Sequence, residues 1–147
     1  MSLEAQIQLD IKSAMLAKEK VRLESLRGIK AAILLAKTAD GSDTIADEAI
    51  IKIIQKLVKQ RKETAEIYKQ QNRAELAENE LAEAGYMEVY LPKQMSEEEI
   101  EAEVKQIIAA VGAAGPQDMG KVMGTATKQL AGKADGRVIS ALVKKLL

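Results

Sequence analysis

The chain has 147 residues, with 22 Lys and Arg balanced by 22 Asp and Glu, a length that predicts one domain or one domain with a small appendage. It contains no Cys and no His, which excludes disulfides, thiolate metal sites and Ser–His or Cys–His catalytic triads. It also has no Phe or Trp, so aliphatic residues and Ala must fill the core, and this mixture favours closely packed helices.

The first half of the chain predicts long amphipathic helices. Apolar residues recur at three- and four-residue steps from Leu3 to Met15, and again from Val21 to Leu34. The polar residues 18–20 between these runs predict a tight bend. Residues 40–43, Asp-Gly-Ser-Asp, predict a turn.

A third helix is expected after that turn, capped by Asp43 or Thr44, with Asp47 in its first turn, where a carboxylate suits the helix dipole. It carries apolar residues from Ile50 onward and runs past Tyr68. A shorter fourth helix, containing Leu76, Leu81, Ala84 and Met87, follows a break at Asn72 or Asn79.

A proline marks the predicted domain boundary. Pro92 disfavours helical conformation at Leu91, so residues 1–91 are expected to form an N-terminal domain of helical hairpins. Residues 96–147 are expected to form a small three-helix module, which makes the protein all-α. Ser96 and Glu99 have the spacing of a capping box at the start of that module.

The remaining boundaries of the module are marked by single residues. Gly112 is expected to end its first helix, and Gly132 its second. Pro116 suits a first helical position, and Asp135 is expected to cap the last helix.

Charge is distributed unevenly despite the overall balance. Residues 1–74 contain 14 Lys and Arg and 10 Asp and Glu, whereas residues 75–105 contain 2 and 10. Residues 106–147 contain 6 and 2, so both ends are basic and the middle is acidic. Such patterning bears on the partners of a protein more than on its fold.

Two glycines interrupt the second helix of the module. Gly120 and Gly124 are four residues apart, so they share one helical face, and Lys121 and Lys128 lie beside it. A smooth basic strip of this kind predicts a place where another backbone, of protein or of nucleic acid, approaches closely. The alternative is an ordinary solvated helix face.

A second basic stripe is expected on the last helix, where Arg137 and Lys144 are also seven residues apart. Lys133 lies in the preceding turn, whose alternative interpretation is a simple turn capped by Asp135. No aromatic residue lies nearby to stack on a base, which favours recognition of the phosphate backbone. The residues expected to bind nucleic acid are Lys121, Gly124, Lys128, Lys133, Arg137 and Lys144.

Three motifs together resemble the GatB/YqeY family: Leu91-Pro92-Lys93-Gln94, Asp118-Met119-Gly120-Lys121-Val122-Met123 and Ala134-Asp135-Gly136-Arg137-Val138. The resemblance covers essentially the whole chain, including residues 58–63, Val-Lys-Gln-Arg-Lys-Glu. It implies a two-part helical protein whose C-terminal module is similar to the tail of the B subunit of the tRNA-dependent amidotransferase. In that setting the module contacts tRNA.

The resemblance therefore implies a tRNA-binding or amidotransferase-associated accessory protein, non-catalytic alone, with tRNA and a tRNA-charging or amidotransferase enzyme as partners. A protein–protein interaction module is one alternative. A second alternative is carbon–nitrogen ligase activity with glutamine as amido-N-donor, which only the family label implies, because fold does not carry mechanism with it. No catalytic residue, metal site or cofactor is expected.

The sequence also predicts a cytoplasmic location. The first residues lack the basic and apolar regions of a signal peptide. No apolar run approaches the roughly 20 residues of a membrane span.

Overall fold

The computed structural model describes residues 1–147 and contains seven α-helices, one short 3₁₀-helix and no strand. The expected all-α fold is confirmed. The chain forms two compact units, Met1–Leu91 and Pro92–Leu147, and each has an apolar core of its own. We call them the N-terminal and C-terminal units.

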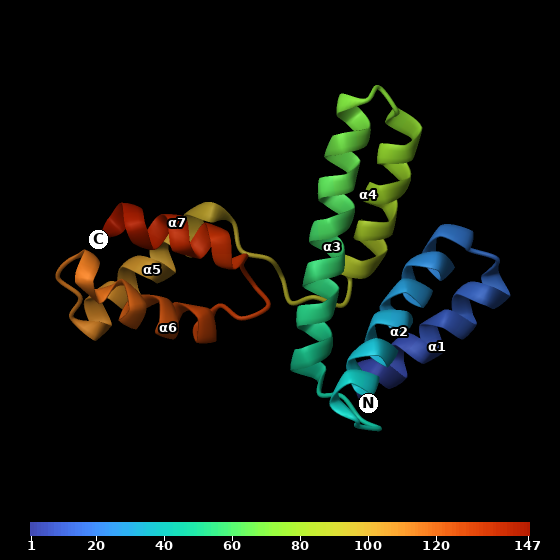
Figure 1. The fold of residues 1–147 in the computed structure, drawn as a ribbon, viewed down its shortest axis with the longest axis horizontal. Coiled ribbons are helices and arrows are strands. Elements are labelled where there is room, and N and C mark those ends of the chain that lie inside the picture. The colour runs from blue at the N-terminus through green and yellow to red at the C-terminus, as the bar shows by residue number, and fades with distance from the viewer. The chain divides into compact units, whose positions relative to one another are not determined.

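The N-terminal unit consists of two helical hairpins, visible in Figure 1: α1 (Leu3–Ala17) with α2 (Lys20–Asp40), and α3 (Asp47–Gln70) with α4 (Ala74–Glu88). Each helix but the last ends at a sharp turn. Lys18 and Gly41 cap α1 and α2 with φ angles of 57° and 63°. The break between α3 and α4 contains Asn72, whose φ is 60°, whereas Asn79 lies inside α4.

Aliphatic side chains and small residues fill the core of this unit. Its buried members are Ile7, Ala14, Leu26, Ile29, Ile33, Ile50, Ile54, Val58, Ala84 and Met87. Ser25 is fully buried as well, and its hydroxyl donates to the Val21 carbonyl at 2.8 Å, which satisfies its polar group. A Cβ atom added at Gly28 would lie 3.4 Å from the Arg61 guanidinium and 3.8 Å from the Met87 side chain, which are ordinary contact distances.

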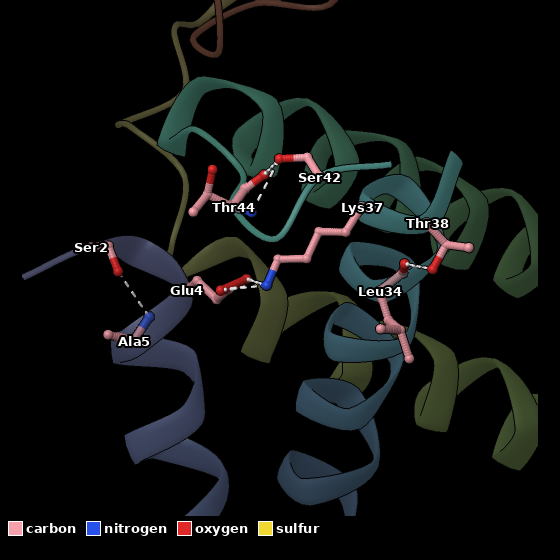
Figure 2. Close-up of polar contacts among 8 residues, drawn as sticks. All are labelled: Ser2, Glu4, Ala5, Leu34, Lys37, Thr38, Ser42 and Thr44. Atoms are coloured by element: carbon pink, nitrogen blue, oxygen red, sulfur yellow. Dashed lines mark hydrogen bonds and ion pairs between the residues drawn. The ribbon is translucent and has the colours of Figure 1, made fainter. Parts of the chain in front are cut away.

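An ion pair joins the two helices of the first hairpin near their ends (Figure 2). The Lys37 ammonium lies 2.6 and 2.7 Å from the two carboxylate oxygens of Glu4, and both side chains are partly buried. Ser2 caps α1, since its hydroxyl accepts from the Ala5 amide at 3.2 Å. These contacts fix the start of α1 against the end of α2.

The start of α3 differs from the expected one. Neither Asp43 nor Thr44 caps the helix, which begins at Asp47 after an N-cap, Ala46, that has no side-chain acceptor. Ser42 holds Thr44 in the loop, because its hydroxyl donates to the Thr44 carbonyl and accepts from the Thr44 amide (Figure 2). Asp47 lies in the first turn as expected, and it accepts a hydrogen bond from the Leu3 amide at 3.0 Å.

The C-terminal unit contains α5 (Glu97–Val111), η1 (Pro116–Asp118), α6 (Met119–Gln129) and α7 (Gly136–Leu146). Its buried core comprises Ile100, Val104, Ile107, Val122, Ala126, Leu130, Ile139, Leu142 and Val143. The capping box at the start of α5 is present, since Ser96 and Glu99 exchange hydrogen bonds between side chain and backbone. Gly112 ends α5 with a φ of 69°.

The segment before α5 is fastened to this unit. The Gln94 side-chain amide donates to the Gly132 carbonyl at 2.8 Å, and the Met95 amide donates to the Lys133 carbonyl at 2.9 Å. Both acceptors lie in the turn between α6 and α7. Residues 94–95 therefore belong structurally to the C-terminal unit. No helix in either unit is long and apolar enough to span a bilayer.

The end of the N-terminal unit is anchored to its first helix. The Tyr90 hydroxyl donates to Asp10 at 2.5 Å, and Asp10 also accepts from the Gln6 side chain at 3.0 Å. Burial raises the pKa of Tyr90 well above its ordinary value of 10.0, and the hydrogen bond to Asp10 raises it further. The folded protein therefore holds this phenolic proton more tightly than the unfolded chain does.

We expect the free energy of unfolding to fall as the pH rises above about 10, because only the unfolded chain then ionises Tyr90 readily. Below that pH the contribution is constant. In Tyr90→Phe the fall in the free energy of unfolding that is due to Tyr90 should be absent. The measurement is urea unfolding between pH 8 and 11.5 for both proteins, and parallel curves would contradict the assignment.

Candidate nucleic-acid interface

The core positions of α6 determine which of its side chains face outward. Val122 and Ala126 are fully buried, with Met119 and Met123 packed beside them. Because a helix turns by 100° per residue, Lys121, Gly124 and Lys128 lie on the opposite face, and all three are exposed.

These residues line one shallow, open depression of about 350 Å³. Its lining comes entirely from α6 and consists of Gly120, Lys121, Gly124, Thr125, Lys128 and Gln129. The glycines leave the helix backbone uncovered at the floor, while the lysines stand beside it. We call this depression the α6 groove.

Nothing inside the protein explains glycine in the α6 groove. A Cβ atom added at Gly120 or Gly124 would meet no atom within 4 Å, and neither residue has a positive φ. Glycine at a mid-helix position such as Gly124 costs about 1 kcal/mol relative to Ala. Helix stability is therefore lost at a surface position without a compensating contact in this chain.

The other predicted cations lie outside the groove. Arg137 and Lys144 form an exposed stripe on α7, with the small Ala141 between them. Lys133 lies in the turn between α6 and α7, and Lys145 extends the basic set in the last turn of α7. Lys145 is not among the residues expected to bind nucleic acid, although its position beside Lys144 in the sequence is a direct signal.

Acidic and basic groups in this unit are segregated by element. Neither α6 nor α7 contains an Asp or Glu, whereas α5 carries five glutamates and the single cation Lys105, 3.8 Å from Glu101. No ion pair involves Lys121, Lys128, Arg137 or Lys144. The outer faces of α6 and α7 therefore present unneutralised positive charge.

Two carboxylates do lie near these helices, and both bind backbone amides. Asp118 accepts from the Ala114 amide at 2.9 Å, ahead of α6. Asp135 accepts from the Arg137 amide at 2.8 Å and caps α7. The turn before α7 is therefore a turn capped by Asp135, which was one of the two interpretations of this segment. Because Asp135 caps α7, the turn does not present a free helix N-terminus to an anion.

The arrangement has the physical features that favour contact with phosphates. Cations on a low-relief surface neutralise phosphate charge, and exposed backbone at glycine permits a close approach. The three tyrosines all belong to the N-terminal unit, so no base can stack on an aromatic ring here. The described residues form no cluster of three or more side chains able to hold a metal ion.

These features define a two-unit helical protein with a cationic C-terminal helix pair. The family model of the Yqey-like proteins matches residues 4–147, nearly the whole chain. The chain therefore belongs to the YqeY-like family, and that part of the resemblance is confirmed.

Curated fungal relatives align over most of the chain. One is altered inheritance of mitochondria protein 41, mitochondrial, of Pyrenophora tritici-repentis, 30% identical over 96% of this chain and 78% of that protein. The protein of the same name from Kluyveromyces lactis is 31% identical over 95% of this chain and 73% of its own length. In Meyerozyma guilliermondii the identity is 42% over 58% of this chain and 44% of the relative.

Replacing Gly124 with Ala should raise the free energy of unfolding of the C-terminal unit by about 1 kcal/mol, because the methyl group enters open space. Gly112→Ala is the matched control. It should lower the same quantity, since φ at Gly112 is 69°. Urea unfolding followed by circular dichroism measures both, and a destabilised Gly124→Ala would show that the fold itself requires this glycine.

Proposed function

We propose that the C-terminal unit binds tRNA through the outer faces of α6 and α7. The protein then acts as a non-catalytic accessory to a tRNA-charging or amidotransferase enzyme. The observation that carries this proposal is the α6 groove, where Gly120 and Gly124, which have no internal role, lie beside Lys121 and Lys128, which have no ion-pair partner. A phosphate backbone is a partner that uses both features, close approach and positive charge.

The family and the charge pattern support the choice of tRNA. This chain belongs to the YqeY-like family, and its resemblance to the wider GatB/YqeY group implies similarity to the tRNA-contacting tail of the amidotransferase B subunit. Recognition would follow the shape and the backbone of the RNA, because the unit has no aromatic side chain. The proposal places the protein in the cytoplasm, whereas the fungal relatives are named as mitochondrial.

The test is the affinity of the full chain for tRNA across a salt series. Lys121→Glu with Lys128→Glu should weaken binding and reduce the slope of log affinity against log salt by about two, roughly one for each lost phosphate contact. Lys12→Glu with Lys30→Glu is the matched control, with the same change in net charge on the N-terminal unit, and should keep the slope.

Two results would contradict the proposal. One is the absence of binding at low salt. The other is an equal loss in the two double variants, which would mean that only net charge matters. Unfolding curves of each variant establish that the fold is kept.

One alternative function is favoured by the same glycines. The α6 groove also fits the close approach of a protein backbone, and in that case the protein is an interaction module. The unchanged chain should then bind a specific protein in the absence of RNA, and Gly124→Glu should abolish that binding. Binding of tRNA to the unchanged chain should be undetectable. For the second alternative, amide transfer, the decisive result is turnover by the purified chain given glutamine, ATP and mischarged tRNA.

A further inference from the structure

The outer face of α4 resembles a surface made for another helix. The inner face buries Ala77, Ala84 and Met87. On the opposite side a second series of positions recurs at steps of three and four residues, as in the contact seam of a coiled coil. Its members are Glu75, Glu78, Ala82 and Gly85, followed by Val89, the C-cap residue of α4, and all are exposed.

The C-terminal half of this series is an apolar patch. Val89 is 73% exposed, and the flanking Tyr86 and Leu81 are 39% and 38% exposed. At Gly85 an added Cβ would meet no atom within 4 Å. Glycine in the interior of α4 therefore lowers helix stability without serving the packing of this chain, as at Gly124. We call Leu81, Ala82, Gly85, Tyr86 and Val89 the α4 patch.

The N-terminal half of the series is acidic. Glu75 and Glu78 continue the face beyond the α4 patch, and neither takes part in a hydrogen bond or an ion pair. The whole helix carries Glu75, Glu78, Glu80, Glu83 and Glu88 with no Lys or Arg, and of these Glu88 is paired with Lys62 of α3 at 2.6 Å. This charge repels nucleic acid and anionic lipid surfaces, and it repels the same face of a second copy.

We propose that the outer face of α4 binds a basic amphipathic helix of another protein. The apolar side of that helix lies on the α4 patch, with Tyr86 as the aromatic anchor and Gly85 as the point of closest approach. Its Lys and Arg side chains meet Glu75 and Glu78. The inference concerns the N-terminal unit and does not rest on tRNA binding by the C-terminal unit.

The test uses the full ¹⁵N-labelled chain and two synthetic 18-residue helical peptides. One carries Leu on one face and Lys and Arg on the other, and its twin has Glu in place of every Lys and Arg. The basic peptide should shift the amide resonances of residues 75–89 saturably, whereas the acidic twin should not. Shifts mapped elsewhere, no shifts, or equal shifts with both peptides would overturn the proposal.

Two variants separate the apolar and the electrostatic parts of the contact. Gly85→Leu should weaken binding of the basic peptide at least tenfold at low and high salt, because its side chain fills the point of approach. Glu75→Lys with Glu78→Lys should weaken it tenfold at low salt and less at high salt. Asp43→Lys with Glu63→Lys changes the net charge equally at exposed sites outside α4 and should leave binding unchanged.

A second substitution keeps the test valid if Gly85→Leu unfolds. Gly85→Ala should raise the unfolding midpoint and still weaken the peptide complex, a combination that a purely structural glycine would not produce. Retention of full affinity by both Gly85 variants would contradict the proposed approach point. tRNA affinity measured on Gly85→Leu should be unchanged, so this inference and the tRNA proposal fail separately.

Discussion

Close packing of helices on small aliphatic side chains is the constraint on which both units depend. Without Phe, Trp or Cys, the chain has neither large rings nor covalent links to hold its helices together. Ala14, Ala84 and Ala126 are therefore buried at 1% exposure or less. Ser25 is buried only because its hydroxyl finds an acceptor within its own helix. Dispersion contacts among these aliphatic side chains stabilise the two cores in place of aromatic rings.

Local signals were sufficient to predict most of the fold. The capping box at Ser96, the helix end at Gly112 and the cap at Asp135 each depend on residues a few positions apart, so the sequence displays them directly. The predicted cap of α3 was wrong because the start of this helix depends on contacts that are not local. It depends on the Ser42 hydroxyl and on the amide of Leu3, a residue 44 positions from its acceptor Asp47. Such contacts exist only after the hairpins have packed.

Apolar spacing alone does not show which residues of a helix are buried, and it identified only part of the candidate site. Met15, Leu34 and Leu76 fit a buried helical face by spacing but are 53%, 62% and 43% exposed. A helix with apolar residues on two sides has no single inner face until its neighbours are known. Spacing was enough to place Gly120 and Gly124 on one helical face, and both line the α6 groove. The single Gly85 has no such signal in the sequence, because only the structure shows the open space around it.

The bond between Tyr90 and Asp10 joins residues 80 positions apart, at the point where the chain leaves the N-terminal unit. Helix ends are ordinarily the first places to fray. Here the last turn after α4 cannot peel away without releasing its hold on α1. Opening of the final segment therefore breaks this hydrogen bond as well, so the amide hydrogens near Tyr90 should exchange more slowly than those of an untethered helix end.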